Sequence, residues 1–366
     1  MGTAAARTGP PADRRPSPVI ACDAERNRTM KAIGYQRPQP GETAGSLVDL
    51  DLPLPEPRPH DLLVRIEAVS VNPVDIKLRT AAAPPDGTPR VTGFDAAGIV
   101  TAVGPEVTRF RPGDAVFYAG AIDRPGANAE FHAVDERIVG PKPASLSFAQ
   151  AAALPLTALT AWELLFDRLR VPYGRKTSDD AILIVNGAGG VGSILTQLAR
   201  RLTGLTVIAT ASRPETAAWT RAMGANHVID HRKPLTDGLK AIGIPQVRYV
   251  ASLTATDTHL GAIIDALAPQ GALAVIDDPA TLDVVPFKRK SLSVHWELMF
   301  TRSLYGTPDM AEQHRILSEV SVLVDSGVLR TTLHEEIGPI TAANLHRAQA
   351  VLESGRAIGK LVLTGF

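Results

Sequence analysis

The chain has 366 residues, of which 45% are hydrophobic, and 38 Lys and Arg residues balance 38 Asp and Glu residues. That length suffices for more than one domain with a sizeable core. Because there is no basic excess to neutralise phosphates, the charge balance argues against nucleic acid as the main partner, and the bulk charge gives no attraction to an anionic membrane surface.

The N-terminal residues 1–29 mix Pro, Ala, Arg, Asp and Glu without an apolar period, and they contain no signal-peptide core. This composition is typical of a disordered leader. Cys22 is the only cysteine, so no intrachain disulfide can form and nothing points to an oxidising compartment. A cytoplasmic location is therefore expected.

Short strands separated by Gly and Pro are predicted for the first domain, residues 30–154. The clearest strand patterns are residues 62–69, 97–103 and 115–118, the last of which follows the turn Pro112-Gly113-Asp114. Strands at this spacing with little helix favour a compact β-barrel or sandwich. The apolar stretch Ala149–Trp162 is too short to span a membrane and is broken by Pro155, so no membrane partner is expected.

Alternating strands and helices are predicted for the second domain, residues 155–300, after a helix start capped by Ser147. Residues 181–185 form a continuous apolar run, as in a strand buried on both faces, and an apolar helical stripe follows over 191–202. Such alternation predicts a doubly wound parallel sheet. Its remaining elements are strands at 205–210, 228–229, 247–251, 272–276 and 292–296, and helices at 214–224 and 258–267.

The last segment, residues 301–366, is predicted to contain helices near 311–323 and 342–354 and a final strand at 360–363. We expect this strand to return to the first domain.

A G-x-G-x-x-G turn lies between the apolar run and the helical stripe, formed by Gly187, Gly189, Gly190, Val191 and Gly192. In this context the turn predicts a dinucleotide site. The first glycine allows the tight turn, the second lets a pyrophosphate approach the backbone, and the last lets helix and strand pack closely. The helix N-terminus then offers free N–H groups to the phosphates.

The residues after the second strand of this domain indicate which nucleotide binds. An NAD site usually places Asp or Glu about 20 residues past the glycines, but this chain has Ala211, Ser212 and Arg213 there. Ser212 can donate to a 2′-phosphate and Arg213 can pair with its charge, so NADPH is predicted. His231 either joins this pocket or lies on the surface.

The sequence resembles the medium-chain dehydrogenase/reductases, and among them the zinc-free, zeta-crystallin-like quinone oxidoreductases. The resemblance covers nearly all of residues 31–366. It rests on the glycine turn and on five further motifs: Val71-Asn72-Pro73-Val74-Asp75, Gly93-Phe94-Asp95-Ala96-Ala97-Gly98, Phe110-Arg111-Pro112-Gly113-Asp114, Leu154-Pro155 with Thr160-Ala161, and Gly359-Lys360-Leu361-Val362-Leu363.

The resemblance implies a GroES-like β-barrel catalytic domain, a Rossmann domain, a cleft between them for nicotinamide and substrate, and a homodimer. It also implies cofactor contacts for Thr160, for the stretch Asp277-Asp278, and for Lys360.

A zinc site is not predicted, although proteins of this kind are often called zinc-type alcohol dehydrogenases. Zinc-dependent members of the family hold the catalytic metal with Cys, His and Cys. Here Asn72 or a neighbour stands at the first position and Phe94 stands in place of the histidine. His227 and His231 flank a predicted strand end and lack a third partner, so they do not form a ligand set.

Without a metal, a conjugated acceptor is the feasible substrate, because its negative charge spreads onto an oxygen that hydrogen-bond donors can stabilise. Candidate donors are Lys77, which is otherwise a surface cation, Tyr118 and Asn72. The resemblance implies that Lys77 and Asp75 lie in the segment that lines the substrate site, and within it Asn72 and Asp75 can instead fix the loop. The pocket walls are expected to be Met299, Phe300 and Trp296, the last with an equal claim to core packing.

The predicted function is therefore NADPH-dependent hydride transfer to a small quinone or enone. Two alternatives remain open: a zinc-free 2-enoyl thioester reductase, and an NADPH-binding protein without catalytic activity.

Overall fold

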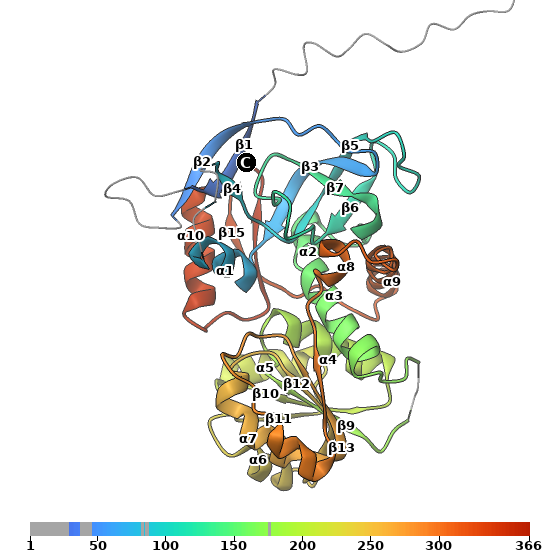
Figure 1. Cartoon of the computed structure of the whole chain (residues 1–366), viewed down its shortest axis with the longest axis vertical. Helices are drawn as coiled ribbons and strands as arrows, with labels where there is room; N and C mark the ends of the chain where they lie inside the picture. Colours follow the sequence, from blue (N-terminus) through green and yellow to red (C-terminus); the bar gives the residue numbers. More distant parts are fainter. Residues whose placement is uncertain (1–28, 37–45, 82–83, 85–87, 175–176) are drawn as a thin grey trace, which may run out of the picture.

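The computed structural model describes residues 29–36, 46–81, 84, 88–174 and 177–366. Figure 1 shows two lobes: the upper contains the first strands and the end of the chain, and the lower contains the middle. The leader predicted for residues 1–29 lies outside the described residues, except for Thr29, which begins the first strand.

Two sheets build the upper, β-rich lobe. The smaller has the order β2-β1-β4, and the larger has the order β15-β16-β3-β5-β6-β8 with β7 also paired to β3. The predicted strands at 62–69, 97–103 and 115–118 are confirmed as β3, β5 and β6. The strands are β1 (Thr29–Tyr35), β2 (Leu47–Pro53), β3 (Asp61–Ser70), β4 (Arg90–Val91), β5 (Ala96–Val103), β6 (Ala115–Tyr118), β7 (Phe131–Asp135), β8 (Val139–Pro141), β15 (Leu333–Gly338) and β16 (Lys360–Thr364).

The lower lobe is built on a six-stranded sheet with the order β11-β10-β9-β12-β13-β14, and all its neighbouring strands are parallel. The predicted doubly wound sheet is confirmed. The strands are β9 (Ala181–Val185), β10 (Thr206–Thr210), β11 (His227–Ile229), β12 (Val247–Ser252), β13 (Leu267–Val275) and β14 (Ser293–Trp296). The helices are α4 (Gly190–Leu202), α5 (Pro214–Met223), α6 (Leu235–Ala241) and α7 (Thr256–Ala266).

The strand order of this sheet reverses between β9 and β12, because the chain winds first one way from β9 and then the other. All five residues of β9 are buried, as expected for a central strand covered on both faces. In open α/β sheets, ligands bind beyond the carboxyl ends of the strands at this reversal point. A ligand site is therefore expected at the turn between β9 and α4.

A long helical connection passes between the lobes. It consists of α2 (Phe148–Ala152), α3 (Pro155–Trp162) and a π-helical segment, η2 (Glu163–Arg168). Ser147 and Gln150 form the capping box of α2. Pro155 occupies the first turn of α3, where a backbone N–H would have no partner within the helix, so its missing N–H costs no hydrogen bond. The stretch Phe148–Arg168 is long and apolar enough to cross a membrane, but 83% of it is buried. It therefore packs as core between the lobes.

The end of the chain returns to the upper lobe, as predicted (Figure 1). β16 pairs antiparallel with β3, so that Val362 lies opposite Ser70. Sequence analysis missed β15, which pairs parallel with β16. The remaining elements are α1 (Pro73–Ala81), η1 (Glu136–Ile138), η3 (Val285–Lys290), α8 (Thr301–Leu304), α9 (Glu312–Asp325) and α10 (Ala342–Glu353).

Candidate active site between the two lobes

The glycine turn lies at the carboxyl edge of the six-stranded sheet. Gly189 is the N-cap residue of α4, so the free N–H groups of the first helical turn are at this edge. A Cβ atom on Gly192 would lie 2.2 Å from the Asn186 carbonyl oxygen, and one on Gly187 would lie 2.6 Å from Ala209 Cβ. At both positions the backbone packs so closely that only glycine fits, as a dinucleotide turn requires.

Side chains from two other elements close over the start of α4. A Cβ atom on Gly190 would lie 3.0 Å from Lys360 Cδ and 3.1 Å from Thr157 Cγ2. Thr157 lies one turn before Thr160 on α3, and both are buried. The turn thus brings together β16 and α3. Thr157 was not singled out from the sequence, although its spacing from Thr160 places both on one face of the helix.

The Lys360 ammonium group is buried and fully hydrogen-bonded. It donates to Val71 O at 2.8 Å and to Asn72 Oδ1 at 2.5 Å, and it pairs with Asp95 Oδ2 at 2.9 Å. A buried ammonium is tolerated only when its charge is compensated and its donors are used. Lys360 therefore holds the Asn72 loop within the upper lobe, and the preceding Gly359 N–H donates to Ala188 O of the glycine turn at 2.8 Å.

Asp95 is the acceptor at the centre of this network. Its Oδ2 accepts from Ser70 Oγ at 2.9 Å and from Asn72 Nδ2 at 2.8 Å, besides Lys360, and its Oδ1 accepts from the Leu156 backbone N–H at 2.7 Å. Asp95 thus ties β3, the Asn72 loop and β16 to the first turn of α3. The sequence contained it in the Gly93-Phe94-Asp95 motif, but nothing there assigned it this role.

Asn72 and Asp75 fix the loop and do not present free donors to a substrate. The Asn72 amide donates to Asp95 and also to Phe94 O at 3.3 Å. Both amide hydrogens are used within the protein in this structure. Asp75 accepts from the backbone N–H groups of Asn72 and Gly93, each at 2.8 Å. Burial raises the pKa of Asp75 to about 6, although both hydrogen bonds favour its ionised form.

Lys77 lies on α1 and points across to the lower lobe. Its Nζ is 2.6 Å from Asp278 Oδ2, and both side chains are more than half exposed. The neighbouring Asp277 accepts from the backbone N–H of Thr256 at 2.9 Å and from its hydroxyl. The predicted donor and the loop after β13 therefore meet at an exposed edge between the lobes.

An aromatic pair lies behind the Asn72 loop. Phe94 and Phe300 pack edge to face with ring centroids 5.5 Å apart, and both are buried. Met299 is also buried, and its carbonyl accepts from Gln313 Nε2 at 2.5 Å. Phe94, Met299 and Phe300 form a dry apolar layer next to the polar network.

The residues predicted to bind a 2′-phosphate lie after β10, where Arg213 already makes contacts within the protein. Arg213 Nε pairs with Glu215 at 2.9 Å, and its Nη2 donates to Arg356 O at 2.9 Å. Ser212 is partly exposed beside it. His231 is half-buried, with its ring 6.1 Å from that of His259, and burial lowers the pKa of His231.

Comparisons with known proteins agree with this architecture. Residues 58–153 match the alcohol dehydrogenase GroES-like domain, and residues 223–363 match a zinc-binding dehydrogenase family. A zinc-type alcohol dehydrogenase-like protein of Staphylococcus aureus (strain MSSA476) is 40% identical over 336 residues, covering 91% of this chain and 99% of that protein.

Two solved structures extend the comparison. A Rhizobium etli CFN 42 protein assigned as a zinc-dependent alcohol dehydrogenase has a TM-score of 0.87 and 58% identity, covering 93% of this chain and 99% of that one. The Escherichia coli quinone oxidoreductase, solved with NADPH, has a TM-score of 0.75 and 26% identity, with coverages of 91% and 99%.

The chain belongs to the medium-chain dehydrogenase/reductase superfamily. It is an oxidoreductase that uses a pyridine nucleotide, and the predicted combination of a GroES-like domain with a Rossmann-type domain is confirmed.

The zinc named for this superfamily's metal enzymes does not fit the residues found here. Within the described ranges, no three His, Cys, Asp or Glu side chains converge as metal ligands would. Phe94 has no atom that can coordinate a metal, and it is packed against Phe300. The carboxylate of the adjacent Asp95 is already occupied by four donors.

Two predicted site residues of this dehydrogenase/reductase lie elsewhere. Tyr118 was expected to face the cleft, but it is fully buried in the upper lobe, where its hydroxyl bonds to His132 Nδ1 at 3.0 Å. Burial also raises the pKa of Tyr118. Trp296 was expected in a pocket wall or in the core, but it is 54% exposed at the end of the edge strand β14.

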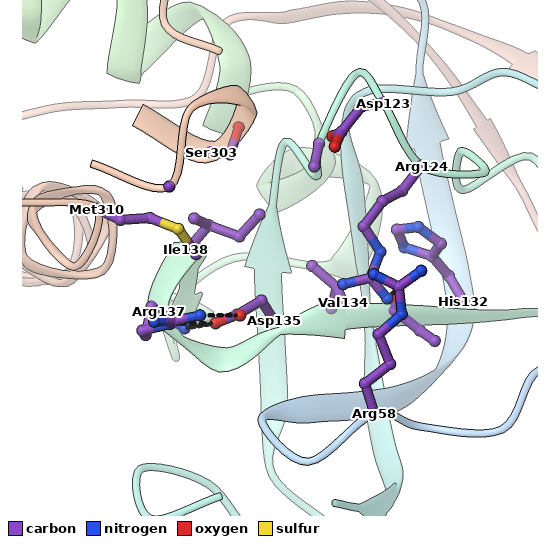
Figure 2. Close-up of a pocket in the computed structure, with 13 residues that line it drawn as sticks. Arg58, Asp123, Arg124, His132, Val134, Asp135, Arg137, Ile138, Ser303 and Met310 are labelled. Atoms are coloured by element: carbon purple, nitrogen blue, oxygen red, sulfur yellow. Dashed lines mark hydrogen bonds and ion pairs between the residues drawn. The ribbon is translucent and has the colours of Figure 1, made fainter. Parts of the chain in front are cut away.

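A cavity of about 180 Å³ lies in the upper lobe, and none of the predicted site residues is among the 13 that line it (Figure 2). Two of its guanidinium groups have acidic partners: Arg124 pairs with Asp61 and Arg137 with Asp135, each at 2.6 Å. Figure 2 shows Arg58 and Arg124 pointing toward one another beside His132. The cavity is therefore separate from the residues around the glycine turn.

Proposed function

We propose that this oxidoreductase transfers hydride from NADPH to a small quinone or α,β-unsaturated carbonyl compound, without zinc. The observation that carries the proposal is the Gly93-Phe94-Asp95 segment. Phe94 is packed into an aromatic pair, and Asp95 is saturated by hydrogen bonds where metal-dependent relatives need ligands. A conjugated acceptor is reducible at such a site because it needs no Lewis acid.

The cofactor preference is argued from the residues after β10. Ala211 has no side-chain acceptor for a ribose hydroxyl, whereas Ser212 and Arg213 can both donate to a phosphate. The Arg213 guanidinium is partly exposed and is held from one side by Glu215, so its position is set before a ligand arrives. The NADPH complex of the Escherichia coli quinone oxidoreductase supports the same choice.

Each part of the chain has a separate task in the proposed reaction. The bound nicotinamide supplies the hydride, and the glycine turn with the start of α4 holds the pyrophosphate. The Lys360–Asp95 network fixes both lobes around it. Phe94, Met299 and Phe300 exclude water, which strengthens electrostatic stabilisation in the site. Lys77 donates a hydrogen bond to the acceptor oxygen as negative charge develops there.

The proposal is tested by following NADPH oxidation with a naphthoquinone, an enone and crotonyl-CoA. Turnover of the naphthoquinone and the enone, with no turnover of crotonyl-CoA, supports the proposal. Preference for crotonyl-CoA would favour the thioester reductase instead. Tight NADPH binding with no oxidation across the three acceptors would favour the non-catalytic alternative.

The cofactor assignment is tested by Arg213→Ala. We expect wild type to have a higher kcat/KM with NADPH than with NADH. In the variant the ratio of these two values should be about tenfold lower, because one charge-assisted contact to phosphate contributes about 1.5–3 kcal/mol. Steady-state kinetics with both nucleotides give the ratio. The control is Arg221→Ala, in the last turn of α5. An unchanged ratio in Arg213→Ala refutes the assignment.

A further inference from the structure

One ion pair joins the two lobes at the exposed edge of the site. Lys77 Nζ and Asp278 Oδ2 are 2.6 Å apart, although the two residues are 201 positions apart in the chain. Lys77 belongs to α1 of the upper lobe, and Asp278 follows β13 of the lower lobe. The contact therefore connects the substrate-lining segment to the carboxyl edge of the parallel sheet.

Both sides of this contact are anchored by stronger interactions close by. At the start of α1, Asp75 accepts two backbone hydrogen bonds. At its end, Arg79 donates to Gln349 Oε1 at 2.6 Å and pairs with Glu353 at 3.0 Å. On the other lobe, Asp277 is bound to Thr256. The backbones on both sides are thus held, and the two facing side chains remain as the adjustable part.

Both side chains of the pair are exposed to solvent, so water and salt compete with their contact. The Lys77 side chain is 54% exposed and that of Asp278 is 78% exposed, and exposed ion pairs are weak and screened by salt. A weak contact suits a group that must exchange its partner when a ligand binds. The four-carbon stem of lysine otherwise leaves its ammonium group free to occupy many positions.

We infer that Asp278 is a positioning residue for Lys77, which it holds at the mouth between the lobes until an acceptor oxygen takes over the ammonium group. This inference rests on the proposed function, because it assigns Lys77 to the acceptor. Asp278 makes no contact with the reacting atoms in this assignment. It reduces the conformational freedom that Lys77 would lose when the acceptor binds.

The experiment compares Asp278→Asn, Lys77→Gln and the reversed pair Lys77→Asp/Asp278→Lys in the full-length protein saturated with NADPH. Asp283→Asn is the matched control, because Asp283 lies in the same loop and bonds to the N–H of Val285. The measurements are kcat and KM for a naphthoquinone at low salt and at about 1 M NaCl. At the higher concentration the Debye length falls to about 3 Å, so exposed charges are strongly screened.

We expect Asp278→Asn to lower kcat/KM for the quinone about two- to fivefold at low salt, the range of an exposed ion pair. At high salt the difference in kcat/KM between Asp278→Asn and wild type should disappear, because salt screens the ion pair in the wild type. The reversed pair should remain as slow as Lys77→Gln, since the ammonium group has moved to the other lobe. If the reversed pair restored kcat/KM to the wild-type value, the ion pair would only hold the two lobes together, and the inference would be overturned.

Two further outcomes separate the inference from the proposed function. If Asp278→Asn equals wild type at low salt while Lys77→Gln is slow, the inference is wrong and the donor role of Lys77 stands. If Lys77→Gln equals wild type, the donor role itself is wrong, and the inference is wrong with it.

Discussion

At the scale of single residues, the buried pair of Lys360 and Asp95 dominates the site. Two charges out of water are costly, and hydrogen bonds to Asn72, Ser70 and the Leu156 backbone offset that cost. The pair therefore gives the site a defined geometry, while its net stabilisation is small. Removing one partner has a much larger effect than removing both.

For Asp95→Ala we expect a loss of about 3–5 kcal/mol in the free energy of unfolding, because the Lys360 charge is left buried without compensation. The measurement is urea denaturation followed by circular dichroism. The double variant Asp95→Asn/Lys360→Met should be less destabilised than Asp95→Ala. Arg315→Ala, which breaks an exposed pair with Glu312, should stay close to wild type. Equal stability of Asp95→Ala and wild type would refute this account.

The residue scale also shows where prediction from the sequence stops. The glycine turn was predictable because each glycine has a local reason within a strand–turn–helix pattern. Tyr118 was misplaced because all of Val116, Phe117 and Tyr118 are buried, so alternation gives no clue to which face meets the cleft. Asp95 could not be assigned, because its partners come from distant parts of the chain. Thr157 had one local signal, its spacing from Thr160, but its contact with Gly190 also comes from a distant part of the chain.

At the scale of elements, the π-helical segment after α3 holds an unusual buried charge cluster. The carboxyl groups of Glu163 and Glu297 lie against each other, and both are buried. Arg302 contacts Glu163 at 2.8 Å and Arg168 contacts Glu297 at 2.8 Å. Burial, and then the neighbouring Glu297, raise the pKa of Glu163 well above its ordinary value. One carboxyl therefore keeps its proton in the folded protein.

The cluster makes stability depend on pH. Because the folded pKa of Glu163 lies above the ordinary value of 4.5, the folded protein holds a proton that the unfolded chain loses. The contribution of Glu163 to stability then falls as pH rises from about 4.5 toward the raised pKa. Glu163→Gln should flatten this slope in urea denaturation between pH 5 and pH 8, whereas Glu319→Gln should not. Identical slopes in wild type and Glu163→Gln would contradict the raised pKa of Glu163.

Elements were predictable from the sequence where one face or both faces are buried. The strands of the parallel sheet and helix α4 follow apolar patterns that the structure confirms. β15 was missed because Leu333–Gly338 has no alternation and three consecutive exposed residues. α1 was missed because it is short and only Asp75 is buried in it. Both depend on neighbours that arrive late in the chain.

At the scale of the whole molecule, the lower sheet has an open edge. Within the described residues β14 pairs with β13 alone. Its last residue, Trp296, is 54% exposed, and Leu298 just after it is 51% exposed. Edge strands with exposed apolar side chains favour pairing with another chain. We propose that the homodimer implied by the family resemblance forms along this edge.

We expect the wild-type protein to sediment as a dimer and Trp296→Glu to sediment mainly as a monomer, because a charge at the edge disfavours pairing. Sedimentation velocity over a concentration series gives the mass. Val322→Glu, at an exposed position of α9 in the other lobe, should remain dimeric. A dimer that persists in Trp296→Glu would place the interface elsewhere.

The pairing of β16 with β3 also has a consequence for biosynthesis. Residues 61–70 leave the ribosome well before their partner at residues 360–364. The lower lobe lies between them and can fold on the nascent chain, whereas the upper sheet cannot be completed until residues 360–364 have also emerged. Until then, β3 lacks its β16 neighbour and Lys360 is absent beside Asp95. The candidate active site is therefore assembled late, after both lobes have been synthesised.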